Sequence, residues 1–190
     1  MYELLVLSLL MRWPLHAYRI AKIGDEILGP EEQISTGTLS SLLNKLVQTG
    51  LIAPADPGSS PFPSERTSRV FTITSAGRER FFALMTDPSA PSGAYSRLFH
   101  LKALHLELLP PENQLFLVEE YCTYCRNVLR SKQEDRQDVA GNPLKQEHMS
   151  LALRETAFAL MRLKTEQWQL ELAWAQVLRE RVLSQVKSEK

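Results

Sequence analysis

The hydrophobic positions at the start of the chain predict helices in close succession. The apolar run Leu4–Met11 contains no turn residue and predicts a short buried helix that ends before Pro14. A second helix is expected over about residues 15–28, where Gly29-Pro30 stops it. A third follows after a short turn, which is the order of elements in a helix-turn-helix.

The third predicted helix has the clearest pattern. Ser35 or Thr36 is expected to cap its start, and Gly50 stands where a glycine often ends a helix. Its apolar residues recur at i, i+3, i+4, i+7 and i+8, namely Leu39, Leu42, Leu43, Leu46 and Val47. The opposite face carries small polar residues with hydrogen-bonding ends: Thr38, Ser40, Ser41, Asn44, Lys45 and Gln48.

Two short strands are expected after this helix. Residues 51–53 predict the first, and the β-branched alternation of Val70–Thr74 predicts the second, with a Pro-, Ser- and Gly-rich loop between them. Thr74 or Ser75 then caps a helix that runs through Met85. A β-hairpin directly after a helix-turn-helix is a wing, so residues 1–86 are expected to form a winged helix-turn-helix.

The second half of the chain predicts helices alone. After a Pro- and Ser-containing linker at 86–92, helices are expected over residues 94–108 and 112–138. From Leu144 to the end there is neither Gly nor Pro. In this segment a set of mostly apolar residues recurs at near-heptad spacing: Met149, Leu153, Thr156, Leu160, Leu163, Gln167, Leu170, Trp174 and Val177. The fold class is therefore mainly α with a small β-hairpin, and residues 93–190 are expected to form a helical dimerisation domain that also offers room for an effector.

Dimerisation is assigned to five residues of the last helix. They are Leu163, Trp168, Leu170, Trp174 and Val177. The two tryptophans are more often core or interface residues than walls of a ligand site, although a pocket for an inducer between subunits is an alternative for them. The protein is expected to be a homodimer.

Charge changes this picture only locally. The 190 residues carry 22 basic and 22 acidic side chains, so the formal net charge is zero. Because phosphate contacts dominate DNA affinity, any DNA-binding surface must come from the arrangement of charges. No positively charged segment precedes the first apolar run, and that run is too short to span a bilayer. The expected location is the cytoplasm, with no membrane partner.

The polar third helix and the wing are the candidate DNA-binding elements. An α-helix fits the major groove, where side chains such as Asn44 read base edges, while hydroxyls and amides at a helix N-terminus suit phosphates. The expected contact residues are Ser35, Thr36, Thr38, Ser40, Ser41, Asn44, Lys45, Arg66 and Arg69. The alternative interpretation is a solvated helix face without a partner.

Four segments of the first half resemble the PadR family of bacterial transcription regulators. Residues 9–18, Leu-Leu-Met-Arg-Trp-Pro-Leu-His-Ala-Tyr, are similar to a leucine-rich stretch that ends Pro-Leu/Met-His-Gly-Tyr. Residues 35–39 are similar to the Gly-Thr-Leu entry to the recognition helix, and residues 50–52 to a Gly-Leu-Ile segment. Residues 69–77 are similar to the wing pattern Arg-x-Tyr-x-Leu-Thr-x-x-Gly.

The resemblance implies a cytoplasmic homodimeric repressor that binds double-stranded DNA at a pseudo-palindromic operator. It also implies regulation by a small molecule or stress signal, for which a small aromatic or cationic effector is the expected class. The sequence departs from the family where Ala17 replaces a glycine, Ser40 a tyrosine, and Asn44 a basic residue. A winged-helix module that binds proteins, or a regulator that has lost its operator, therefore remains the alternative function.

Other chemistry has little support in the sequence. Cys122 and Cys125 share one helix face and are expected to be buried structural residues, with a redox-sensing pair as the alternative. A zinc site needs about four ligands, and no second cysteine pair exists. The chain contains no nucleophile elbow, P-loop or dinucleotide-binding glycine motif. No catalytic residue, metal or cofactor is expected, and the protein is not expected to be an enzyme.

Overall fold

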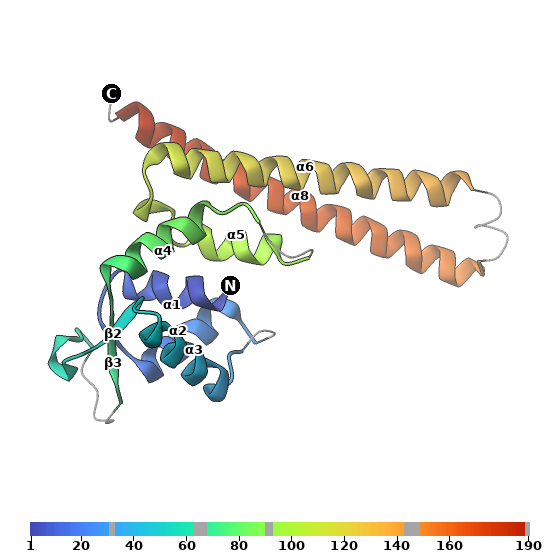
Figure 1. Cartoon of the computed structure of the whole chain (residues 1–190). Helices are drawn as coiled ribbons and strands as arrows, with labels where there is room; N and C mark the ends of the chain where they lie inside the picture. The colour runs from blue at the N-terminus through green and yellow to red at the C-terminus, as the bar shows by residue number, and fades with distance from the viewer. Residues whose placement is uncertain (31–32, 63–67, 90–92, 143–148, 189–190) are drawn as a thin grey trace. The chain divides into compact units, whose positions relative to one another are not determined.

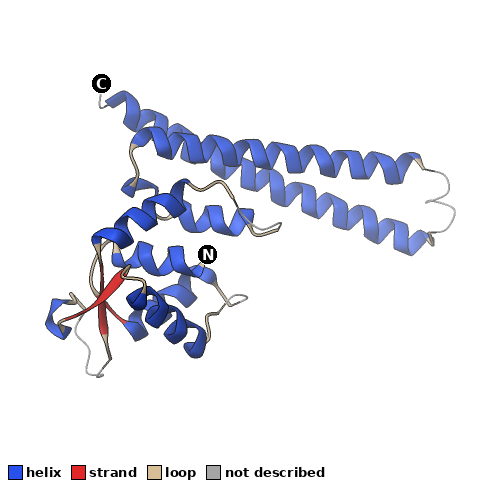
Figure 2. Cartoon of the chain, in the orientation of Figure 1, coloured by secondary structure: helices blue, strands red, loops and turns tan. Residues whose placement is uncertain are grey.

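The structure of the chain is a computed structural model that describes residues 1–30, 33–62, 68–89, 93–142 and 149–188. It divides into two compact units, Met1–Leu106 and Glu107–Lys190 (Figure 1). Helices dominate both, and a small antiparallel sheet lies in the first (Figure 2). The predicted fold class, a winged helix-turn-helix followed by a helical region, is confirmed.

The elements of the first unit follow the order that the sequence predicts, with one short strand added. Their order is α1 (Tyr2–Leu10), β1 (Leu15–His16), α2 (Ala17–Leu28), α3 (Thr36–Gln48), β2 (Ile52–Ala55), the 3₁₀ turn η1 (Pro57–Ser59), β3 (Val70–Ile73), α4 (Ser75–Thr86) and α5 (Tyr95–Ala103). A second 3₁₀ turn, η2 (Leu106–Leu108), leads into α6 (Pro111–Gly141) and α8 (Leu151–Ser188).

The core of the first unit is built around α1. Every residue from Leu4 to Leu10 is buried, and the one polar member, Ser8, donates its hydroxyl to the carbonyl of Leu5 at 2.8 Å. Helix α2 approaches α1 closely because Gly24 has no side chain, and a Cβ there would lie 3.2 Å from Leu5 Cδ2. Helix α3 adds the predicted apolar stripe, of which Leu39, Leu43 and Leu46 are fully buried. This packing leaves the polar face of α3 outside.

The sheet has one strand more than the sequence predicts. Its order is β1-β3-β2, so β3 is central and pairs antiparallel with both neighbours. The residues of β1, Leu15 and His16, were expected to begin a helix; instead they pair with Phe71 and Val70. Strand β2 contains Pro54, which lies opposite Phe71. A strand of two residues has no periodicity to read, so only its tertiary partner defines it.

A tight junction joins α3, β2 and α4. The hydroxyl of Thr74 donates to the carbonyls of Gly50 and Leu51, at 2.6 and 3.0 Å, and accepts from the amide of Gly77 at 3.0 Å. Gly50 has a φ of 71°, the left-handed conformation that favours glycine at the end of a helix. A Cβ at Gly77 would lie only 2.0 Å from the carbonyl oxygen of Leu51. The wing strand is therefore fixed to the end of α3.

Helix α5 belongs to the first unit. The ammonium group of Lys102 is buried and donates to the carbonyl of Asp87 at 2.6 Å, which ties α5 to the end of α4. Burial lowers the pKa of Lys102. The compact unit thus extends to Leu106, beyond the linker predicted at 86–92. The division of functions between residues 1–86 and 93–190 stays a prediction.

The second unit is an antiparallel hairpin of two long helices, α6 and α8. Its contacts run in opposite directions along the two helices, since Glu119 pairs with Arg179 at 2.9 Å while Tyr124 stacks edge-on against Trp168 at 5.6 Å between ring centroids. Tyr121 donates its hydroxyl to Glu171 at 2.5 Å. Within the described part of the chain, no helix is both long and apolar enough to cross a membrane.

Helix α8 has two hydrophobic faces, of which the sequence predicts only one. Residues at alternating spacings of four and three are buried or half-buried: Met161, Thr165, Trp168, Leu172, Ala175, Arg179 and Val182. We call the second face the outer seam; its large apolar members are all exposed, namely Leu153, Leu160, Leu163, Leu170, Trp174 and Val177. A helix with two such seams is expected to pack on two sides.

Candidate nucleic-acid interface

Helix α3 presents its polar face to solvent. Ser35 is the residue that caps the helix, because its hydroxyl accepts from the amide of Thr38 at 3.1 Å, and Thr36 is the first helical residue. All the polar residues predicted on this helix are exposed: Ser35, Thr36, Thr38, Ser40, Ser41, Asn44 and Lys45. The backbone amides of the first turn and two hydroxyls therefore lie together at the N-terminus, where an anion such as a phosphate is favoured.

Asn44 and Arg69 contact each other across the gap between helix and wing. Two nitrogens of the Arg69 guanidinium donate to Asn44 Oδ1, both at 3.2 Å. The guanidinium also lies over the ring of Phe71, 5.4 Å from its centroid, and the Arg69 carbonyl accepts from the amide of Ala17 at 3.0 Å. We call this contact the Asn44–Arg69 clasp. It brings together two predicted contact residues that are 25 positions apart in the sequence.

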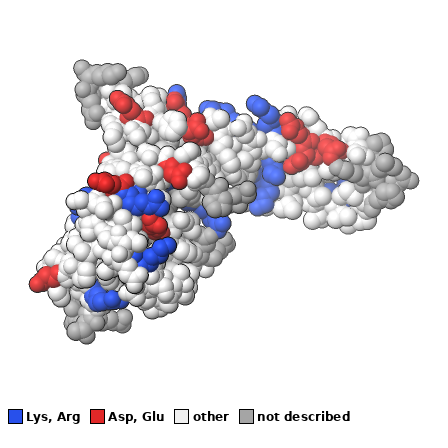
Figure 3. Space-filling view, in the orientation of Figure 1, with Lys and Arg blue, Asp and Glu red and all other residues white. Residues whose placement is uncertain are grey.

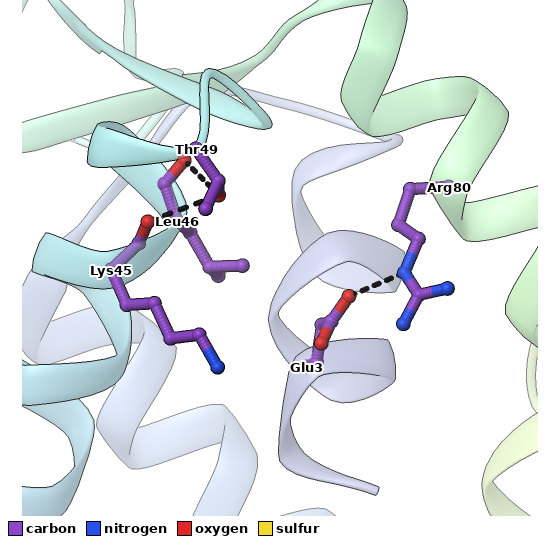
Figure 4. Close-up of polar contacts among 5 residues, drawn as sticks. All are labelled: Glu3, Lys45, Leu46, Thr49 and Arg80. Carbon is purple, nitrogen blue, oxygen red and sulfur yellow. Dashed lines mark hydrogen bonds and ion pairs between the residues drawn. The ribbon is translucent and has the colours of Figure 1, made fainter.

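Lys45 lies on the exposed side of the last turn of α3. Thr49 donates its hydroxyl to the carbonyls of Lys45 and Leu46, at 3.0 and 3.2 Å, and so closes the end of the helix (Figure 4). Figure 4 shows the Lys45 ammonium extended away from these groups. The same view shows Arg80 of α4 donating to Glu3 of α1 at 2.7 Å. The Lys45 ammonium is thus exposed on α3, next in sequence to the exposed Asn44.

The base of the wing contains an aromatic cluster that the sequence does not predict. Trp13 meets Phe62 edge-on at 5.9 Å between ring centroids, and Arg19 lies over the Phe62 ring at 5.3 Å. Arg19, on α2, is half-buried here. His16 Nδ1 lies 3.1 Å from the hydroxyl of Ser68. Arg66, the other predicted wing contact, lies outside the described residues.

Charge on this molecule is mixed. Figure 3 shows basic and acidic side chains interleaved over the face it draws, in keeping with equal numbers of each in the sequence. With a formal net charge of zero, the chain has no overall excess of positive charge to attract nucleic acid. If the protein binds DNA, specific contacts from α3 and the wing would have to distinguish one DNA sequence from another.

The predicted dimerisation residues fall on both faces of α8. Leu163, Leu170 and Val177 belong to the outer seam, with 48, 73 and 57% of their surface exposed. Trp168 instead contacts Tyr124 of α6 in the same chain. Trp174, also in the outer seam, is 37% exposed, and its ring centroid lies 6.5 Å from that of Tyr121 on α6. Single hydrophobic residues scattered over a surface are ordinary, but a row of them this long on one helix marks a candidate interaction surface.

The two cysteines are buried and unpaired by disulfide. Burial raises the pKa of Cys122, and burial together with the charge of Glu171 raises the pKa of Cys125 to about 12. A thiol in this state is a poor nucleophile at neutral pH, which favours a structural role over redox sensing. Among the residues described, no three His, Cys, Asp or Glu side chains come together as metal ligands would.

A hollow of about 410 Å³ lies on the helical hairpin. Its walls carry three arginines and one glutamate; the residues are Arg136, Leu151, Arg154, Glu155, Phe158, Ala159 and Arg162. Guanidinium groups outnumber carboxylates here, so the hollow suits an anion better than a cation.

Most of the first unit matches a known protein family. Residues 6–83 match the transcriptional regulator PadR-like family. Bacillus subtilis PadR in complex with operator DNA is similar over 95% of this chain and 96% of its own, at 17% identity and a TM-score of 0.41. The Vibrio cholerae virulence activator AphA is similar over 97% of this chain and 99% of its own, at 18% identity and a TM-score of 0.40. No curated protein sequence matches the chain.

Proposed function

We propose that this chain, whose residues 6–83 match the PadR-like family of transcriptional regulators, is a sequence-specific DNA-binding regulator that acts as a homodimer. The observation that carries the proposal is the exposed polar face of α3 beside the wing strand β3. A helix so presented enters a major groove, and the wing reaches the adjacent backbone. The family supplies the expectation that the bound DNA is an operator.

Each part of the interface has a distinct role in this proposal. The hydroxyls of Ser35 and Thr38 and the first amides of α3 bind phosphate. Asn44 reads a base edge in the major groove, and Lys45 neutralises a phosphate beside it. Phosphate contacts fix the register of the protein on the duplex, whereas the base contact supplies sequence preference.

The outer seam of α8 is the proposed dimer interface. Most of its large side chains are at least half exposed in one chain, and burying them against a second copy removes apolar surface from water. Two copies related by a two-fold axis would place their α3 helices about one turn of DNA apart, on a pseudo-palindromic operator. Repression in the cytoplasm is the outcome we expect where the bound dimer covers a promoter.

The DNA-binding proposal is tested by titrating fluorescent promoter DNA from around the protein's own gene with the full chain. We expect specific binding whose affinity falls steeply with salt. Lys45→Ala should weaken binding to every sequence and lower the salt dependence, whereas Arg130→Ala on α6 should change neither. Absence of specific binding at physiological salt would leave the protein-binding module as the better interpretation.

The dimer proposal is tested by light scattering on Leu170→Arg. This side chain is 73% exposed, so the substitution leaves the contacts within the chain intact. We expect a monomer. Gln176→Arg, at an exposed polar position on the same helix, should remain dimeric. A dimeric Leu170→Arg would show that the subunits meet elsewhere.

The same proposal includes an effector, and the hollow on the hairpin narrows its class. The expected effector was a small aromatic or cationic molecule. Three arginines beside Phe158 favour a small aromatic anion over a cation. Adding aromatic acids should release the DNA, and Arg154→Ala should weaken that response. A response to cationic compounds alone would contradict the assignment of this hollow.

A further inference from the structure

We infer that the Asn44–Arg69 clasp sets the base preference of the recognition helix, so that Asn44 selects guanine over adenine. The inference rests on the proposed function and adds to it the base that this position reads. It starts from a property of the two side chains. A guanidinium group carries only hydrogen-bond donors, so the Asn44 atom that faces it must be the amide oxygen.

The clasp uses the full acceptor capacity of Asn44. A carbonyl oxygen has two lone pairs, and Asn44 Oδ1 accepts from two separate nitrogens of Arg69, both at 3.2 Å. Asn44 therefore keeps only its amide nitrogen, with two N–H donors, for a ligand. In the free protein the clasp changes asparagine from a donor and acceptor into a donor alone.

The position of Arg69 is set by contacts beyond Asn44. Its residue directly precedes β3, the central strand, and its carbonyl accepts from the first amide of α2 at 3.0 Å. Its guanidinium lies over Phe71, a residue with no exposed surface. The clasp therefore joins the polar face of α3 to the sheet and holds the Asn44 amide in one orientation.

The donor pattern decides which base suits this position. Asparagine normally recognises adenine by donating to N7 and accepting from N6, which needs a vacant amide oxygen. Guanine presents two neighbouring acceptors, N7 and O6, in the major groove. An N–H of the Asn44 amide that points between these two atoms meets an acceptor on either side, whereas in adenine it would face the N6 donor, which would meet no acceptor. A buried donor without a partner is unfavourable, so adenine is disfavoured at this base pair.

The test is selection of binding sites from random duplex DNA by the full chain and its variants. Asn44→Ala identifies the base pair that depends on residue 44, because the variant loses its base preference at that base pair. We expect the unmodified protein to select guanine at that base pair. Arg69→Met keeps an unbranched side chain over Phe71 but removes the donors, and its ratio of adenine to guanine should rise about tenfold at that base pair alone.

Asn44→Asp changes the other residue of the clasp, keeping its acceptor while removing its N–H donors. Its carboxylate still accepts from Arg69 but has no N–H to donate, so the guanine preference should disappear. Arg130→Met, an exposed arginine on α6, should select the same sites as the unmodified protein.

Three results overturn the inference. One is selection of adenine by the unmodified protein at the base pair that depends on residue 44. Another is uniform weakening by Arg69→Met with every preference intact, which would make Arg69 a phosphate contact only. The third is an Asn44→Asp variant that still selects guanine. Failure of the unmodified protein to enrich any sequence would instead refute the proposed function.

Discussion

Gly77→Ala tests the junction that fixes the wing strand to the end of α3. The new Cβ would lie 2.0 Å from the carbonyl oxygen of Leu51 and 2.7 Å from Ile73 Cγ1. The Leu51 oxygen cannot move freely, because it also accepts from the amide and the hydroxyl of Thr74, at 3.1 and 3.0 Å. Overpacking costs about 1–3 kcal/mol and a lost helix cap about 1 kcal/mol, so we expect a destabilisation of about 3 kcal/mol.

The assay is urea unfolding followed by circular dichroism at one fixed protein concentration, since association would otherwise shift the midpoint. Gly37→Ala is the control. It makes the same change in α3, where the nearest atom to the new Cβ is Ser35 Oγ at 4.0 Å. We expect it to stabilise the protein by about 0.4–1 kcal/mol. A Gly77→Ala variant within about 0.5 kcal/mol of the unmodified protein would refute this account of the junction.

Three further predictions concern individual contacts. Tyr121→Phe should destabilise the hairpin by about 1–2 kcal/mol, because the hydrogen bond from its hydroxyl to the Glu171 carboxylate is lost; unfolding curves that coincide with those of the unmodified protein would contradict this. The raised pKa of Cys125, from 9.0 to about 12, means that the unfolded thiol ionises first, so stability should fall as the pH rises above about 9. Cys125→Ala should lessen that fall, which denaturation at pH 8 and pH 10 would measure. Arg80→Ala should cost under about 1 kcal/mol, because its ion pair with Glu3 is partly exposed to solvent, and a larger loss at low salt would contradict this prediction.

The elements that the sequence predicts correctly are those with local sequence signals. The stripe of α3 and the caps of α3 and α4 follow from short-range rules, and the structure confirms them at Ser35, Gly50 and Thr74. Strand β1 was missed because two residues have no period, and only the pairing with β3 defines them. Helix α8 was interpreted as having one seam, although its pattern contains two that overlap. The two rows of apolar residues on α8 can be told apart only from the structure, which shows which row packs on α6.

The candidate site shows the same limit. Asn44 and Arg69 were each predicted as contact residues from their type and element. Their mutual contact was not, because it depends on how β3 passes the exposed face of α3. The stacking of Arg19 on Phe62 was missed for a similar reason, since a basic residue on an amphipathic helix is ordinarily assigned to solvent. Periodicity places a residue on a face, whereas tertiary structure decides what meets it there.

The small sheet also bears on how this protein behaves when concentrated. An exposed strand edge is a template for pairing with another molecule, the step from which amyloid-like growth proceeds. Here one edge strand, Leu15–His16, is too short to add a stable neighbour, and the other carries Pro54, whose ring removes a backbone donor. Both margins of the sheet are thus poor templates. The first unit is therefore expected to resist aggregation through its strands, because neither edge of its sheet readily accepts a further strand.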